Sequence, residues 1–414
     1  MTVTDVTNTW IRELDSFAVF QGGALSPATA RPLPLRDRPA LPDPQEWSSM
    51  SRLLEQMREH VLRFAADSAV QLPRKSLFRG ESPNDRYRLE AGQTEVLGKL
   101  YLLDGGSSAP FTPNLQRFVA FVPATYSRNG DSGHYAWVHY TPVWGGDRAA
   151  APRARDITQA YPGGLWTHFY IADYLLRHRL LAAYAAARVN AVLFLPVHRF
   201  TAGDALSPLA QPASLLAILR QLCAGLERID RRLRAHQGDR AGSIEAYGVS
   251  CFSFGAQYSS GPFTRSGVAV DDYGRLRAGV FLDGVASEPV RVCRDIFGEG
   301  DGERGWLAMP VPGTQAPRRL AMYQQSNLSG RDFVSAAATI FRTGPPGPGT
   351  TLRRTPAWRR NHGYFHRVDN QQLVCVAQEG RCGDRSLDYE YCHGRIHALF
   401  MEEGFTFSRD SFLW

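Results

Sequence analysis

Ser253 has the sequence setting of a nucleophile. The apolar, strand-like run 244–252 leads directly into this serine, and Gly255 then opens a segment that can continue as a helix. A serine on a sharp strand-to-helix turn keeps its hydroxyl exposed, which acyl transfer requires. The usual pattern is G-x-S-x-G, and Cys251 occupies its first position here. Ser250 fits less well, because it falls within the strand and is followed two positions later by phenylalanine instead of glycine.

A carboxylate and two histidines follow Ser253 in the order that a catalytic triad needs. Asp283 comes at the end of the next apolar strand, where a carboxylate can orient an imidazole and stabilise its protonated form. His393 and His397 lie near the end of the chain. A histidine that titrates near neutral pH can take the serine proton and return it to a leaving group. The chain order Ser, Asp, His is that of the serine hydrolases with a strand-turn-helix nucleophile. Two other carboxylates, Asp332 and Asp369, are alternative acids that would serve equally well as loop or capping residues.

His397 is the preferred base, and His393 is the alternative. The run 387–392 is strand-like and is followed by Gly394, so His397 lies beyond a turn from which it can lean back over the sheet edge. A histidine still on the strand end has its direction fixed by the pleat. For the oxyanion hole, we expect the backbone N–H of Phe254 and a second N–H after the strand 117–123, at Ala124 or Thr125.

Alternating strands and helices predict the fold that would position these residues. From about residue 97, near-continuous apolar runs such as 117–123 (RFVAFVP) and 191–197 (AVLFLPV) alternate with helical patterns such as 213–235. This alternation indicates βαβ units and a mostly parallel sheet flanked by helices. We expect residues 1–95 to form an N-terminal arm and helical cap, with an amphipathic helix over 50–66. Residues 96–414 would form the catalytic domain, with an insertion around 340–370.

Three short motifs resemble a bacterial α/β-hydrolase family that includes lipase effectors of type VI secretion systems with phospholipase activity. Residues 252–256 (FSFGA) are similar to its G-F-S-R-G-A elbow, and residues 280–287 (VFLDGVAS) are similar to its V-F/W-D-T-V-A/G-S motif. Residues 394–397 (GRIH) are a loose counterpart of its histidine motif. The resemblance implies an α/β-hydrolase fold, a lipid or other acyl-ester substrate and no cofactor. It also implies export of the protein by a signal-independent secretion system, with a secretion or immunity partner.

A second hypothesis is a catalytically inactive binding or scaffold protein built on the same fold. The missing first glycine of the elbow and the shortened histidine motif motivate this hypothesis. The geometry around the Ser253 hydroxyl separates the two hypotheses, because a working nucleophile needs a histidine within reach.

The charge pattern adds a candidate surface. The net charge is +7, and the segment 351–367 (TLRRTPAWRRNHGYFHR) interleaves arginines with aromatic residues. This mixture suits an anionic membrane surface, although a solvated basic loop is the simpler interpretation. The sequence has no P-loop lysine and no zinc-finger or RNA-recognition motif, so no nucleic-acid partner is expected.

The remaining features indicate an ordinary globular chain made in the cytoplasm. The six cysteines form no C-x-x-C pair and are expected to be reduced and mostly buried. His362 and His366, like His393 and His397, are four residues apart, but H-E-x-x-H is absent, so no metal site is expected. Residues 1–15 lack the apolar region of a signal peptide, and charged and polar residues interrupt the apolar stretch 180–197.

Overall fold

The structure is a computed structural model, and it describes the main body of the sheet and the helices beside it. The described residues are 1–5, 98–106, 109–123, 125–127, 133–141, 175, 180–198, 206–234, 241–264, 274–284, 289–298, 305–309, 311, 316–324, 353–360, 363–369, 371–379 and 400–412. The predicted helix 50–66 therefore lies outside the described residues, as do most of the predicted N-terminal arm and the linker 343–349.

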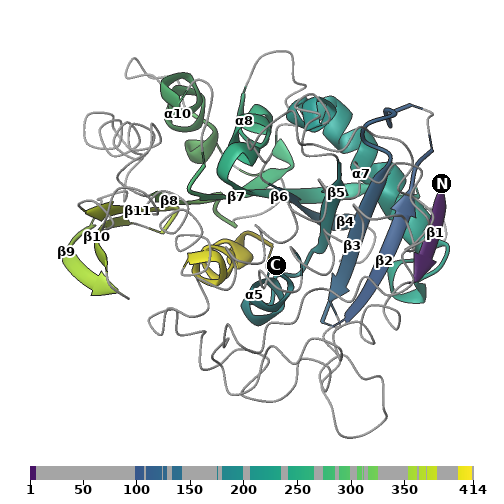
Figure 1. Cartoon of the computed structure of the whole chain (residues 1–414), viewed down its shortest axis with the longest axis horizontal. Helices are drawn as coiled ribbons and strands as arrows, with labels where there is room; N and C mark the ends of the chain where they lie inside the picture. Colours follow the sequence, from purple (N-terminus) through teal and green to yellow (C-terminus); the bar gives the residue numbers. More distant parts are fainter. Residues whose placement is uncertain are drawn as a thin grey trace, which may run out of the picture.

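A single 11-stranded sheet forms the centre of the described structure (Figure 1). Its strand order is β1-β2-β3-β5-β4-β6-β7-β8-β11-β10-β9. The strands are β1 Thr2–Asp5, β2 Gly98–Asp104, β3 Arg117–Pro123, β4 His134–Tyr140, β5 Val192–Val197, β6 Ile244–Phe252, β7 Leu276–Leu282, β8 Arg319–Gln324, β9 Arg353–Arg360, β10 Gly363–Asp369 and β11 Leu373–Glu379.

The middle of the sheet is parallel, as the sequence predicts. β5, β4, β6, β7, β8 and β11 pair with one another in the parallel sense. β3 runs antiparallel to β5 and β2, while β9 and β10 form an antiparallel extension beyond β11. The parallel strands β4, β5 and β7 are buried along their whole length, because both faces of this part of the sheet are covered.

Helices cover both faces of the sheet (Figure 1). α7 (Pro212–Glu227) lies on one side with α8 (Ala256–Ser259) and α10 (Pro289–Phe297), while α5 (Leu180–Ala187) and the C-terminal helix 400–409 lie on the other. α7 begins with a proline in its first turn, where no intrahelical N–H bond is lost. It buries an apolar stripe of Leu215, Leu216, Ile218, Leu219, Leu222 and Leu226.

An aromatic cluster joins the C-terminal helix to the sheet. The Trp137 ring on β4 packs edge-on against Tyr184 of α5 at 6.2 Å and against Phe405 of the C-terminal helix at 5.4 Å. Edge-to-face pairs of this kind add roughly 0.5–1.5 kcal/mol each beyond the area that they bury. The last helix is therefore fixed to the same face as α5, close to the middle of the sheet.

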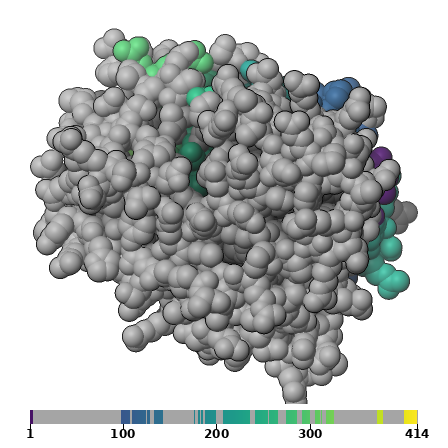
Figure 2. Space-filling model, in the orientation of Figure 1, coloured from purple at the N-terminus to yellow at the C-terminus, as the bar shows by residue number. Residues whose placement is uncertain are grey.

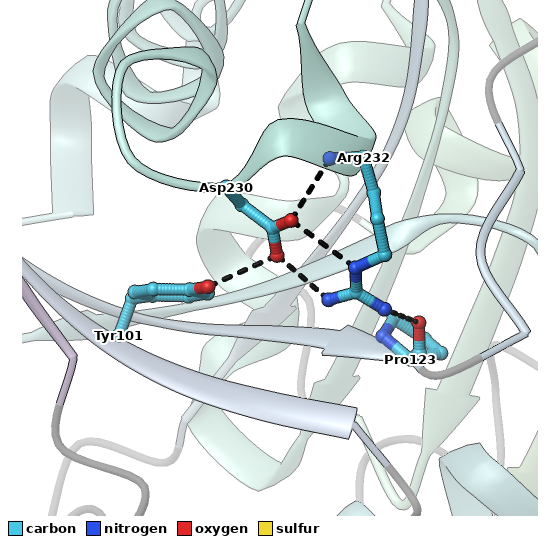
Figure 3. Close-up of polar contacts among 4 residues, drawn as sticks. All are labelled: Tyr101, Pro123, Asp230 and Arg232. Carbon is cyan, nitrogen blue, oxygen red and sulfur yellow. Dashed lines mark hydrogen bonds and ion pairs between the residues drawn. The ribbon is translucent and has the colours of Figure 1, made fainter.

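The end of α7 is fastened to β2 by a buried carboxylate (Figure 3). Tyr101 Oη donates a hydrogen bond of 2.9 Å to Asp230, and Arg232 Nη2 donates one of 2.6 Å to the same carboxylate. Burial alone would raise the pKa of Asp230, but the hydrogen bonds from Arg232 and the charge of that guanidinium outweigh burial and lower it. Arg232 also donates to the carbonyl oxygen of Pro123, which ties the end of β3 into the cluster.

Two segments differ from the sequence prediction. Residues 2–5, at the start of the predicted arm, form the edge strand β1 on β2. Figure 2 shows this strand, in purple, at the surface on the right of the view. The other difference is the expected insertion around 340–370, where residues 353–369 extend the same sheet as β9 and β10. β9 and β10 lack the strict alternation of apolar and polar residues that would have marked them in the sequence, and β1 has only four residues.

The strand order and directions define the fold class. A mostly parallel sheet flanked by helices, with the antiparallel strand β3 between β2 and β5 and a serine on the turn after β6, is the α/β-hydrolase fold. No helix within the described ranges is long and apolar enough to cross a membrane. The four cysteines of the described part, Cys223, Cys251, Cys293 and Cys375, are free and buried, as expected.

Candidate functional site

Ser253 occupies a strained turn between a strand and a helix. β6 ends at Phe252, a short 3-10 helix covers Ser253–Gly255, and α8 begins at Ala256. Ser253 has a backbone φ of 57°, in the left-handed region that residues other than glycine rarely adopt. Such strain costs of order 1–3 kcal/mol and is characteristic of functional sites, including the nucleophile elbow. The Ser253 side chain is half-buried, whereas Ser250 is 1% exposed.

Gly255 is required by the close packing of the elbow on β4. A Cβ atom at this position would lie 2.5 Å from the backbone oxygen of Tyr140 and 3.0 Å from that of Thr141. Backbone atoms cannot move aside cheaply, so only glycine fits. The last glycine of the x-x-S-x-G pattern therefore has a steric cause, and the elbow lies against the end of β4.

Cys251, in the first position of that pattern, is accommodated as a small buried side chain. It is fully buried, and burial raises the pKa of its thiol to about 12, so the group stays protonated and is not a nucleophile. A Cβ atom on Gly284 would lie 3.6 Å from Cys251 Sγ and 2.7 Å from the Cβ of Ala256. The turn after β7 thus approaches both the elbow strand and the first residue of α8, because residue 284 has no side chain.

Asp283 lies at the carboxyl end of β7, next to the elbow. Its side chain is 0% exposed, and its backbone φ of 48° turns the chain sharply after the strand. The Asp283 N–H donates to the Tyr323 carbonyl oxygen at 2.7 Å, and Gln324 Nε2 donates to Asp283 Oδ1 at 3.0 Å. β6, β7 and β8 are neighbouring parallel strands, so Ser253, Asp283 and Gln324 share one edge of the sheet.

The other candidate acids do not join this site. Asp369 is the last residue of β10, where it pairs with Val374 near the start of β11. Since β11 runs parallel to β8, Asp369 lies at the amino edge of the sheet, opposite Ser253. The alternative role for Asp369 is therefore wrong, and Asp332 lies outside the described residues.

Thr125, one of the two residues expected to supply the second oxyanion donor, lies at the opposite edge of the sheet from Ser253. β3 runs antiparallel to β5, with Arg117 opposite Val197 and Phe121 opposite Leu193. The end of β3 is thus at the amino edge, and the next described aromatic, Tyr126, contacts the first residue of β4 through its hydroxyl, 3.0 Å from His134 Nδ1. Thr125 is therefore on the wrong edge to serve Ser253, and Ala124 lies outside the described residues. Phe254, which directly follows Ser253, stays the predicted first donor.

The histidines with described side chains each have another polar partner. His134 Nε2 lies 2.7 Å from Glu227 Oε1, and His198 Nε2 lies 2.9 Å from Thr141 Oγ1. His139 Nδ1 is 2.8 Å from Ser250 Oγ. His393 and His397 both lie outside the described residues, so the choice between them stays a prediction.

Thr141 and His198 form a buried pair that sequence reasoning missed. They directly follow the neighbouring parallel strands β4 and β5 and are 0% and 2% exposed. Each is a single polar residue directly after an apolar run, and this position could have identified both residues from the sequence. The pair lies at the same edge of the sheet as Ser253. Within the described ranges, no three His, Cys, Asp or Glu side chains are grouped to hold a metal ion.

Ser250 belongs to a buried polar network in β4 and β6 and not to the elbow. Trp137 Nε1 donates to Ser250 Oγ at 2.8 Å, and His139 Nδ1 lies 2.8 Å from the same hydroxyl. Complete burial lowers the pKa of His139 to about 3, so its ring is neutral near pH 7. Of the two serines, Ser253 is therefore the more accessible one.

The burial of His139 predicts a pH dependence of folding. The unfolded chain binds a proton at this residue near pH 6.5, and the folded protein binds it only near pH 3. The free energy of unfolding should therefore fall as the pH drops through this window, by about 1.4 kcal/mol per pH unit from this residue. Between pH 7 and pH 5, the free energy of unfolding measured with urea should fall by about 2 kcal/mol less in His139→Asn than in the wild type. Equal losses in the two proteins would contradict the burial argument.

The basic segment 351–367 falls largely on β9 and β10. Trp358 pairs with Phe365, and Arg354 pairs with Val368, at the edge of the sheet opposite β1. A solvated loop is therefore the wrong description of its backbone. The anionic-membrane interpretation stays a prediction.

Comparisons with known proteins give distant likenesses. No protein-family model matches the sequence, and no curated protein matches it. One similar solved structure is described as a thioesterase from Silicibacter sp. TM1040, at 11% identity and a TM-score of 0.26, covering 60% of this chain and 76% of the other. Another is esterase B from Lactobacillus rhamnosis with a tributyrin phosphonate inhibitor, at 12% identity and a TM-score of 0.29, covering 72% and 81%. The α/β-hydrolase fold assigned above rests on the strand order and directions of this chain.

Proposed function

We propose that this protein is a serine hydrolase that cleaves acyl esters. The observation that carries the proposal is Ser253, a non-glycine residue at a φ of 57° on the turn between β6 and α8, beside a buried carboxylate at the end of β7. A left-handed serine at this point carries a backbone strain that glycine would not have. Exposure of a nucleophile explains the cost.

The reaction would use a Ser-His-Asp triad. Ser253 Oγ attacks the carbonyl carbon while a histidine takes its proton, and Asp283 orients and stabilises the protonated ring. The N–H of Phe254 donates to the oxyanion of the tetrahedral intermediate. The histidine then gives its proton to the leaving alcohol, and water, activated by the same histidine, releases the acid from the acylated serine. No cofactor takes part in this sequence.

The position of the C-terminal helix favours His397 as that histidine. Phe400, its first residue, stacks on the Tyr323 ring with centroids 4.7 Å apart, and the Tyr323 carbonyl accepts from the N–H of Asp283. His397 is three residues before Phe400, so its Cα lies within about 11 Å of that anchor. His393 is seven residues away, which permits about 25 Å. The anchor thus limits the distance of His397 from Tyr323 more tightly than that of His393, which supports His397 as the base.

The geometry of the site supports an acyl-ester substrate and nothing more specific. A phospholipid substrate, export by a type VI secretion system and an immunity partner rest on the motif resemblance, and association with anionic membranes rests on the basic segment. The competing hypothesis is an inactive scaffold. One of the two reasons for the scaffold hypothesis was the missing first glycine of the elbow. The elbow forms with Cys251 in that position and Gly255 packed against β4, so this reason no longer applies.

Hydrolysis of a panel of p-nitrophenyl esters from acetate to palmitate tests the proposal. We expect turnover of at least one ester, preceded by a burst of about one equivalent of p-nitrophenol as the serine is acylated. The variant Tyr101→Phe, altered at the buried hydrogen bond of β2, serves as a control for general stability and should retain the burst. A folded protein with neither burst nor turnover on any ester would favour the scaffold hypothesis.

A further inference from the structure

We propose that Gln324 is a positioning residue that fixes the Asp283 carboxylate for its histidine partner. The inference rests on the proposed function, because it assigns a role within the same triad. Gln324 is the last residue of β8, on the strand beside the one that carries Asp283. It touches neither Ser253 nor the reacting ester in this account and would act only through Asp283.

The geometry points to Gln324 because it meets the carboxylate in a fully buried setting. Asp283 is 0% exposed and Gln324 is 1% exposed, and Nε2 of the amide donates to Oδ1 at 3.0 Å. Leu282 pairs with Tyr323 in the parallel register, so the two residues are the next ones along their strands. The Asp283 N–H bond to the Tyr323 carbonyl, at 2.7 Å, fixes the backbone beside the carboxylate. The carboxylate is thus restrained at both its main chain and its Oδ1 atom.

The amide of glutamine suits this task better than other side chains. It donates a hydrogen bond to a charged oxygen without adding a charge, so it stabilises the ionised carboxylate that a triad needs. It also stops the carboxyl group from rotating about its last bond, which keeps Oδ2 in one direction. Methionine would fill nearly the same space without a donor, and glutamate would add a second carboxylate about 3 Å away.

A purely structural hydrogen bond between β7 and β8 is the competing explanation. If the bond were only structural, its loss would lower the amount of folded protein and leave kcat per folded molecule unchanged. The control Tyr101→Phe removes a hydrogen bond of the same kind, from a buried hydroxyl to an aspartate at 2.9 Å, on β2, four strands from β6 in the sheet order (Figure 3). It reports what the loss of a buried bond to a carboxylate does when the triad is untouched.

The variants Gln324→Met and Gln324→Glu test the proposal on the full-length protein. All rates are referred to active sites that are titrated with a fluorophosphonate. We expect Gln324→Met to lower kcat about 10- to 100-fold, the loss typical of removing a hydrogen bond to a charged group, with KM changed less than about twofold. Tyr101→Phe should keep the wild-type kcat per active site.

Gln324→Glu gives a readout that packing alone cannot produce. Two carboxyl groups this close share a proton, and the shared proton can replace the amide as the donor to Asp283. The variant should therefore be more active than Gln324→Met near pH 6 and should lose kcat as the shared proton leaves between about pH 6 and 9. The wild type should instead gain kcat as its histidine base loses a proton above about pH 6 and then keep a plateau to about pH 9. If Gln324→Met is too poorly folded to titrate, this pH profile decides alone.

The outcomes separate this inference from the proposed function. If the wild type hydrolyses esters, Ser253→Ala does not, and both Gln324 variants keep the wild-type kcat and pH profile, the role of Gln324 is overturned and the triad stands. Loss of stability in Gln324→Met without loss of kcat per site would make the bond merely structural. A wild type without ester hydrolysis would overturn the proposed function and this inference with it.

Discussion

Replacing Ser253 with alanine should lower kcat for ester hydrolysis by about 10⁴- to 10⁶-fold, because the reaction loses its nucleophile and cannot form the acyl intermediate. The residual rate would come from binding and from the oxyanion donor. Alanine also keeps the left-handed backbone conformation as costly as serine does, so the free energy of unfolding should change little. Steady-state hydrolysis of the best p-nitrophenyl ester, with circular dichroism as a check of folding, measures both effects.

Ser250→Ala is the matched control on the same strand. Ser250 is buried and lies 2.8 Å from both Trp137 Nε1 and His139 Nδ1, so its removal leaves those two groups without this partner. We expect a loss of stability of about 1–3 kcal/mol and a wild-type kcat per folded molecule. A Ser253→Ala protein with more than a tenth of the wild-type kcat would remove Ser253 from the mechanism, as would a Ser250→Ala protein that is folded and inactive.

His397→Ala should be the second most damaging change, with a loss in kcat of about 10³- to 10⁶-fold. Without a base, the Ser253 hydroxyl keeps its proton at neutral pH and the leaving alcohol receives none. We expect this loss at His397 because it is three residues from Phe400, which stacks on Tyr323 beside Asp283. The kcat of the variant at pH 8, with stability measured in urea, tests this.

His393→Ala supplies the comparison, since this histidine is the other candidate and is seven residues away from the same anchor. Its kcat should stay within about threefold of the wild type, as expected of a residue that touches no reacting group. The opposite pattern, with His393→Ala inactive and His397→Ala nearly silent, would show that the anchor argument selects the wrong residue.

Most of the central sheet could be predicted from the sequence because its strands are buried on both faces. The runs RFVAFVP and IEAYGVSCF became β3 and β6 with the expected bounds, and the apolar strand expected before Asp283 is β7, LRAGVFL. Continuous apolar runs of this length have few other stable arrangements in a chain with many helices. The turn at Ser253 and the carboxylate after β7 followed from these strand ends.

The order and direction of the strands could not be predicted from the same runs. β3 and β5 have similar apolar sequences, yet β3 runs against its neighbours, so Thr125 is at the opposite edge from Ser253. Asp369 was an alternative acid for the same reason, because the sequence does not give the strand directions. β10 is antiparallel to β11, which places Asp369 at the opposite edge from Ser253. Apolar periodicity reports which faces are buried and carries no information on which strand lies beside which.

Contacts between residues far apart in the sequence also cannot be predicted from short motifs. Cys251 in place of glycine lowers the match to the nucleophile pattern, but Gly284, from the next strand end, provides the close approach that the elbow needs. Gln324 carries no motif and gained a role only when β8 was placed beside β7. Such compensations are set by the sheet as a whole and not by the spacing along the chain.

The most direct test of the central claim is to identify the residue that a fluorophosphonate probe modifies. Reaction of the folded protein with the probe, followed by proteolysis and peptide mass spectrometry, reports which hydroxyl is activated. We expect one modified site, Ser253, with no label in Ser253→Ala and full label in Ser250→Ala. A label on any other residue, or a label that persists in Ser253→Ala, would contradict it.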